Sequence, residues 1–194
     1  MNKDFELTDE QSLRDLQSYL SRAKRLDPDG LVRLRAYGNV LAAYVAPLFS
    51  GSVLDGGLTV IGLRTTELAA EAEVDRLVSI SSVLDRLARV LESSTTDYRV
   101  EVPEAGQRAA WAGISPPRSG WVAGGVIDEA ELTALARAGI QEVADTLPAS
   151  VGGPIAARIR QEIWGRGIEQ DTRIPNGAAF VAAGLGFMTE KEQV

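Results

Sequence analysis

The spacing of apolar residues changes along the chain from helical to alternating and back to helical. The first helical stretch begins at Thr8, where Thr-Asp-Glu-Gln11 is typical of a capping box. Its expected buried face consists of Leu13, Leu16, Leu20 and Ala23. The turn Asp27-Pro-Asp-Gly30 is expected to end this helix, because proline disfavours helical geometry in the residue before it.

An alternating pattern with a period of two begins at Leu31. Residues 31–37 and 40–46 both alternate, and Gly38-Asn39 between them predicts a two-residue hairpin turn. The inward face of this hairpin should hold Val32, Leu34, Ala36, Leu41, Ala43 and Val45. The outward face should hold Arg33, Arg35, Tyr37 and Tyr44. A third run, 58–63, is apolar on both faces, which favours a central strand.

The remaining apolar runs predict helices and one more strand. A second helix is expected over 73–91, and residues 98–102 predict a fourth strand that Pro103 closes. Helices are then expected from Asp128 to about Pro148, from Gly152-Gly-Pro154 to Trp164, and over 178–185. The inward positions of these last helices are Leu132, Leu135, Ala136, Ile140, Val143, Ile155, Ile159 and Ile163, and Phe180 and Phe187 should dock on the body.

These elements together predict the fold class α+β. We expect a single domain over residues 1–194, with a mostly antiparallel sheet of about four strands covered by helices. Its strand-rich part should span about 30–103 and its helical part about 128–187. The inward face of the hairpin should pack against one or both of the first two long helices.

Composition removes many kinds of chemistry. The chain has 194 residues and contains neither cysteine nor histidine. Disulfides, thiol nucleophiles, zinc sites with Cys or His ligands and histidine-dependent catalysis are therefore excluded. No cofactor or metal is indicated by any motif, and the interpretation leans towards a protein that is not an enzyme.

Charge and hydropathy restrict the partners and the location. The net charge of −7 argues against nucleic acid and anionic membranes, because both require a positive face. The polar N-terminus predicts that there is no signal peptide, and no apolar run is long enough for a membrane span. The expected location is the cytoplasm.

The candidate site is the stretch from Trp111 to Trp121, which combines two tryptophans with a Pro-Pro pair, glycines and Arg118. An arginine beside aromatic rings can bind a carboxylate or phosphate while an apolar group stacks on the rings. The candidate residues are Trp111, Ser115, Arg118, Trp121, Trp164 and Arg166. The expected partner is a small anionic molecule or another protein.

Other interpretations of the sequence stay open. The two tryptophans could simply fill the ends of the core, while Arg118 pairs with a local carboxylate. An enzyme that uses only carboxylates and arginines would have Asp55 as its least poor candidate. In a homo-oligomer, the aromatic stretch would be the interface. The outward face with Arg33 and Tyr37 mixes charge with aromatic rings, as single-strand nucleic-acid platforms do, but a solvated face is favoured.

Several motifs resemble those of a conserved family of uncharacterised actinobacterial proteins. They are Leu26-Asp-Pro-Asp-Gly30, Thr59-Val-Ile-Gly-Leu-Arg64, the stretch Trp111–Trp121, Trp164-Gly-Arg166, Gly177-Ala-Ala-Phe180 and Leu185-Gly-Phe187. The resemblance covers about residues 27–187. It implies one domain and an intracellular bacterial setting, and it implies no catalytic or binding residues because no activity is known for the family.

Overall fold

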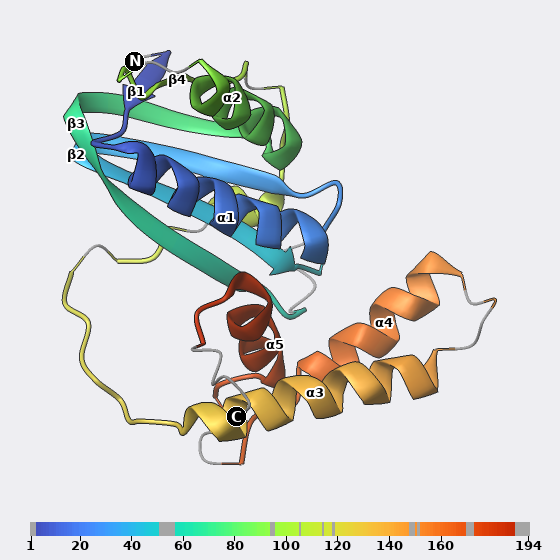
Figure 1. Ribbon diagram of the computed structural model, residues 1–194. Helices are drawn as coiled ribbons and strands as arrows, with labels where there is room; N and C mark the ends of the chain where they lie inside the picture. The colour runs from blue at the N-terminus through green and yellow to red at the C-terminus, as the bar shows by residue number, and fades with distance from the viewer. Residues whose placement is uncertain are drawn as a thin grey trace, which may run out of the picture. The chain divides into compact units, whose positions relative to one another are not determined.

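The computed structural model describes residues 3–50, 57–93, 96–104, 106–113, 115–117, 119–147, 150, 152–169 and 173–188. The chain divides into two compact units. The first consists of Met1–Pro47 and Ile61–Ala112, and the second of Leu48–Val60 and Gly113–Val194. Two compact units can be two domains or two parts of one domain. The single domain expected from the sequence therefore stays a prediction. A segment from the first half of the chain thus belongs to the unit that holds the C-terminal helices (Figure 1).

Helix α1, Glu10–Leu26, begins two residues after Thr8, where the sequence predicts its start. Its N-cap is Asp9 rather than Thr8, and the Asp9 carboxylate accepts a hydrogen bond of 2.7 Å from the backbone N–H of Ser12. That bond lowers the pKa of Asp9. A carboxylate competes well for this position because it is charged and faces the positive end of the helix dipole. The expected inward face is confirmed and also includes Tyr19; it comprises Leu13, Leu16, Tyr19, Leu20 and Ala23.

Strand β2, Leu31–Leu48, contains both alternating runs. Every second residue is buried on each side of the middle, and the six predicted inward residues are all buried: Val32, Leu34, Ala36, Leu41, Ala43 and Val45. Gly38 has a φ of 61°, which other residues rarely adopt, and the ribbon of β2 turns back on itself (Figure 1). The chain thus reverses direction at Gly38, as the predicted turn requires, and both runs belong to the single element β2.

Strand β3, Val60–Ser79, extends well into the region predicted as the second helix. Helix α2 begins only at Ile80 and ends at Glu92, so the predicted start at residue 73 is wrong. Val74 and Val78 are both compatible with helical spacing, but they also lie on the same face of a strand, and they are buried as strand residues. The backbone N–H of Ile80 donates to the carbonyl of Gly30, which fixes the start of α2 beside the turn before β2. The run at 58–63 is less buried than a central strand requires, since Leu63 is 40 % exposed.

The described residues form two sheets of two strands each, β1 with β4 and β2 with β3, so the predicted single sheet of about four strands is wrong. Strand β1, Asp4–Glu6, pairs antiparallel with β4, Arg99–Glu101. Phe5 and Val100 are paired and buried, while the neighbouring residues are charged. The sequence does not predict β1, because one inward residue between two carboxylates is too short a pattern to recognise. The chain is nonetheless α+β, as expected.

The burial of Tyr19 in the first unit can be tested through the pH dependence of unfolding. Its side chain is buried under α1, and its hydroxyl lies 3.4 Å from the carbonyl oxygen of Ala43. Burial raises the pKa of Tyr19 above its ordinary value, although Arg64 opposes this shift. The folded state therefore holds the phenolic proton more tightly than the unfolded chain does. We expect the free energy of unfolding to be unaffected below about pH 10 and to fall as the pH rises beyond it.

Urea unfolding between pH 8 and 11.5 measures this effect. The Tyr19→Phe variant should lose much of the alkaline decrease, while Tyr37→Phe, which changes an exposed tyrosine, should keep it. An equal decrease in the Tyr19→Phe variant would contradict the assignment.

The second unit contains α3, Glu129–Thr146, α4, Gly153–Trp164, and α5, Asn176–Leu185. Asp128 caps α3 as predicted, with its carboxylate accepting from the backbone N–H of Ala130. Three of the residues expected to face inward are instead substantially exposed: Ile140 by 51 %, Ile155 by 56 % and Phe187 by 45 %. The inward face of α3 is rotated towards Ala136 and Gly139, because a bulky ring from α4 occupies the space beside it.

That ring belongs to Trp164, which is buried. A Cβ atom at Gly139 would clash with the six-membered part of the indole. The Trp164 ring also stacks on Phe180 of α5, with ring centroids 4.6 Å apart and an angle of 25° between the planes. One tryptophan therefore joins all three helices of the second unit.

The segment from Leu48 to Val60 completes this unit. A Cβ atom at Gly177 would lie 2.7 Å from Cδ1 of Leu48 and 2.8 Å from Cδ2 of Leu58, so the glycine lets both leucines approach α5. The side chain of Gln161 on α4 holds the segment by its backbone: Oε1 accepts from the N–H of Leu58 at 2.7 Å, and Nε2 donates to its carbonyl at 3.5 Å.

Candidate functional site

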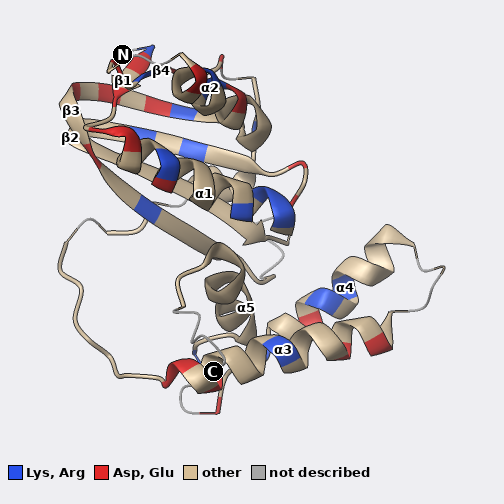
Figure 2. Ribbon diagram, viewed as in Figure 1, with Lys and Arg blue, Asp and Glu red and all other residues tan. Residues whose placement is uncertain are grey.

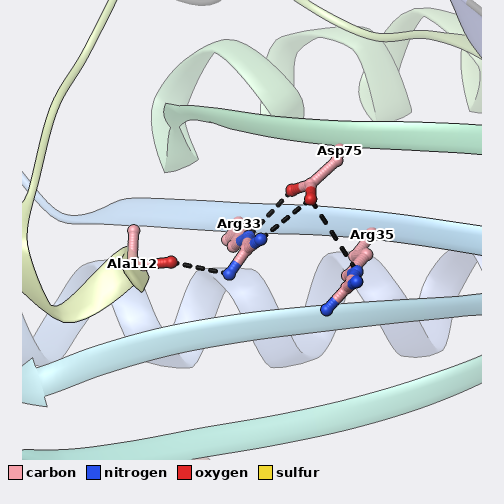
Figure 3. Close-up of polar contacts among 4 residues, drawn as sticks. All are labelled: Arg33, Arg35, Asp75 and Ala112. Carbon is pink, nitrogen blue, oxygen red and sulfur yellow. Dashed lines mark hydrogen bonds and ion pairs between the residues drawn. The ribbon is translucent and has the colours of Figure 1, made fainter. Parts of the chain in front are cut away.

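Trp111, the first residue of the predicted site, belongs to the core of the first unit. It lies in the short 3-10 helix η1, Ala110–Gly113, and is only 4 % exposed. Arg33 of β2 ties this segment to the sheet, because its Nη1 donates to the carbonyl of Ala112 at 2.6 Å (Figure 3). In this position Trp111 is a packing residue, and its ring is not available to a ligand.

The same arginine forms a two-point ion pair with Asp75 of β3. Nε and Nη2 of Arg33 each lie 2.8 Å from one carboxylate oxygen, and Nε of Arg35 lies 3.8 Å from the second oxygen (Figure 3). The hydrogen bond from Arg33 lowers the pKa of Asp75, and the same bond raises the pKa of Arg33. The Arg33 side chain is only 17 % exposed, so it is more covered than a solvated face predicts, whereas Tyr37 on the same face is 71 % exposed. Sequence reasoning missed Asp75 because it placed that residue in a helix.

Trp121, unlike Trp111, is exposed to solvent. It lies in the extended stretch before α3, and 72 % of the residue is exposed. Its indole N–H donates to the carbonyl of Pro117 at 2.9 Å, which closes a small local loop. Ser115 is also exposed. Arg118, like Asp55, lies outside the described residues, so the structure does not test their roles.

Trp164 and Arg166 have partners within the second unit. Trp164 is part of its core, as described above, so it is not a surface for a ligand. Nη1 of Arg166 contacts both carboxylate oxygens of Glu142 on α3, at 2.8 and 2.9 Å. Both residues therefore stabilise the packing of α3 against the end of α4.

A cleft of about 520 Å³ opens in the second unit beside these residues. Helix α4 contributes Arg158, Gln161 and Glu162 to its lining. The segment held by Gln161 contributes Gly57 and Leu58. The residues after α4 contribute Gly165, Arg173 and Pro175. Basic residues of α4 are blue in Figure 2. Sequence reasoning missed this cleft. The one signal for it is the spacing of Arg158, Gln161 and Glu162, which places three polar side chains on one side of a helix.

Backbone contacts join the residues just after α4 to those just before α5. Gly167 and Pro175 form an isolated antiparallel bridge. The N–H of Ile168 donates to the carbonyl of Ile174 at 2.8 Å, and the side chain of Ile168 is buried. The N–H of Asn176 donates to the carbonyl of Arg166 at 2.7 Å. These contacts place one wall of the cleft in a fixed position beside α4.

Fold and sites together define an α+β protein with two compact units, an exposed stretch before α3 and a polar cleft among the C-terminal helices. Residues 1–113 match a domain of unknown function, DUF8010, and residues 116–194 match a second one, DUF8185. The first match covers more than half of the chain, which therefore belongs to the DUF8010 family. No curated protein and no solved structure matches the chain. None of the helices within the described ranges has the length and apolar character that crossing a membrane requires.

Proposed function

We propose that the chain is a non-enzymatic binding protein that engages a partner protein through the stretch 115–128, of which the structure describes residues 115–117 and 119–128. The observation that carries this proposal is the exposure of its large apolar side chains: Trp121 by 72 %, Val122 by 88 % and Val126 by 97 %. Clustered exposed apolar residues mark interaction sites in folded proteins, because leaving them in water is unfavourable. We name this stretch the connecting segment.

The backbone of the connecting segment supports the same function. Within the described chain, the one hydrogen bond that residues 119–127 make is from the indole N–H of Trp121 to Pro117. Their backbone N–H and carbonyl groups can therefore pair with another chain, as extended peptides do when they bind in a groove. A partner with an apolar groove satisfies both features, since it would cover the side chains and pair the backbone.

Trp121 is the proposed anchor of this contact. Tryptophan is enriched among the few residues that dominate binding free energy at protein interfaces. Arg118 and Ser115 precede it in the sequence, and we propose that they supply polar contacts at the rim. The alternative in which an anionic small molecule binds between two indoles has less support, because the Trp111 ring is buried.

A photo-crosslinking amino acid at position 121, incorporated in the producing cells, tests the proposal. We expect a discrete adduct that disappears when Val122 and Val126 are both changed to aspartate. The matched control is the same amino acid at Tyr37, an aromatic residue of the first unit that is 71 % exposed. The protein identified in the adduct is then purified and titrated against the chain. Trp121→Ala should weaken its binding by about 30-fold, the equivalent of about 2 kcal/mol.

Two results would contradict the proposal. One is the same set of adducts from positions 121 and 37. The other is an affinity for the purified partner that Trp121→Ala does not change. An adduct with twice the mass of the chain would instead favour the homo-oligomer, and sedimentation analysis of the Trp121→Ala variant would check it.

We also propose a cytoplasmic setting in an actinobacterium. The absence of cysteine supports the location. The motif resemblance and the strong preference for arginine over lysine support the origin; only Lys3, Lys24 and Lys191 are lysines. Fractionation of cells that produce the chain would test the location.

A further inference from the structure

We infer that the cleft between α4 and the Leu58 segment is a binding site for a small organic anion. The ligand class is a carboxylate or phosphate group on a small body that also carries a hydrogen-bond donor. This site is separate from the connecting segment, and it would stand even if no partner protein binds there.

The charge of the cleft differs from that of the whole chain. The chain carries a net charge of −7, but two arginines and one glutamate line the cleft, Arg158, Arg173 and Glu162. A cavity with excess positive charge in an acidic protein attracts anions locally, whereas the rest of the surface repels them. Guanidinium groups present paired N–H donors that match the geometry of carboxylate and phosphate oxygens.

Arg158 is available for such a ligand. It is exposed on α4, and within the part of the chain that the structure describes it forms no ion pair, although Glu162 lies one turn further along the helix. Arg166, two turns after Arg158, shows the contrast, because both oxygens of Glu142 occupy its guanidinium. Of these two arginines of the second unit, Arg158 is therefore the one that can accept an oxyanion without losing an existing pair.

The walls of the cleft are built before any ligand arrives. Gln161 uses both ends of its side-chain amide to hold the backbone of Leu58, so its polar atoms and the segment stay in place. The bridge between Gly167 and Pro175 holds a further part of the lining. Preformed walls reduce the entropy lost on binding. The volume of about 520 Å³ falls within the range typical of small-molecule sites.

The lining also indicates what the ligand carries besides its anionic group. Glu162 can accept a hydrogen bond from a hydroxyl or amino group, and the side chains of Leu58 and Pro175 offer apolar surface for a short carbon body. An inorganic anion would use only Arg158. A hydroxylated organic anion would use Arg158 and Glu162, so it should bind more tightly.

Nuclear magnetic resonance titration of the full chain tests this inference, with inorganic phosphate, glycerol 3-phosphate and citrate as probes. The reporters are the backbone amide of Leu58 and the side-chain amide of Gln161, which are described above as one hydrogen-bonded pair. We expect saturable shifts of both signals with at least one probe, and tighter binding of glycerol 3-phosphate than of inorganic phosphate. Arg158→Ala should weaken binding about tenfold, as loss of a charge-assisted hydrogen bond predicts.

Variants of α4 separate this site from general charge effects. Arg160→Ala is the matched control, because it removes another exposed arginine of the same helix, one that is not among the residues that line the cleft. Glu162→Gln should strengthen the binding of inorganic phosphate, since it removes a negative charge from the lining. An unchanged midpoint of thermal unfolding shows that each variant still folds. The inference is overturned if no probe shifts the two signals, or if Arg160→Ala weakens binding as much as Arg158→Ala does.

Discussion

Replacing Trp164 by alanine should unfold the second unit under conditions in which the parent chain is folded. The residue is only 3 % exposed, stacks on Phe180 and fills the space beside Gly139. Removal of a buried tryptophan side chain costs about 3–5 kcal/mol, because its transfer free energy is lost and a cavity remains. That is a large share of the 5–15 kcal/mol by which domains are ordinarily stable.

Hydrogen exchange measured along the chain would check this result. Protection should fall in α3, α4 and α5 and persist in α1. Gly139→Ala should lower protection in the same helices, because the new methyl group meets the indole, and this cost should exceed the roughly 1 kcal/mol that alanine gains over glycine in a helix. Gly153→Ala is the matched control, since nothing lies within 4 Å of the added Cβ there. Full protection of α3 in the Trp164→Ala variant would refute the assigned role.

A fragment of residues 114–194 should fail to fold cooperatively, although it contains all three helices of the second unit. It lacks the segment that places Leu48 and Leu58 against Gly177 and that satisfies the side chain of Gln161. Loss of this segment exposes apolar surface on α5 and leaves the side-chain amide of Gln161 without the backbone groups of Leu58. We expect helical circular dichroism without a sigmoidal melting curve.

The segment supplied as a separate peptide provides the control. A peptide of residues 48–60 should increase the helicity of the fragment, whereas a peptide with serine in place of Leu48 and Leu58 should not. The complementary fragment, residues 1–113, should melt cooperatively, because α1, α2 and the buried face of β2 lie within its own unit. Cooperative melting of 114–194 alone would show that the segment is dispensable.

The structure shows where sequence patterns suffice and where they do not. The inward residues of α1 and β2 could be predicted because a long run with one period has only one face to bury. The boundary between β3 and α2 could not, because Val74 and Val78 fit both periods, and the contact of Ile80 with Gly30, which is distant in sequence, fixes the start of the helix. The exposure of Ile140 depends on a ring from another helix, which no local pattern reveals.

The same distinction applies to the candidate site. The composition of the stretch from Trp111 to Trp121 indicates a candidate site, but composition does not say which of its two tryptophans is buried. Arg33 and Asp75 are 42 residues apart, and the pair forms only because β2 and β3 are neighbours. The cleft likewise needs residues from both halves of the chain, Leu58 and Arg158 among them. A set of polar side chains on one helix is too common a pattern to mark a site by itself.

The placement of the three tryptophans makes the chain its own fluorescence probe. Trp111 is buried in the first unit, Trp164 is buried in the second, and Trp121 is exposed in the connecting segment. Variants that keep a single tryptophan would therefore report separately on the core of the first unit, the core of the second unit and the connecting segment. Blue-shifted emission from Trp111 or Trp164 would signal an intact core, and acrylamide should quench Trp121 most strongly. Folding of each unit and occupancy of the connecting segment could thus be followed in one solution without any attached dye.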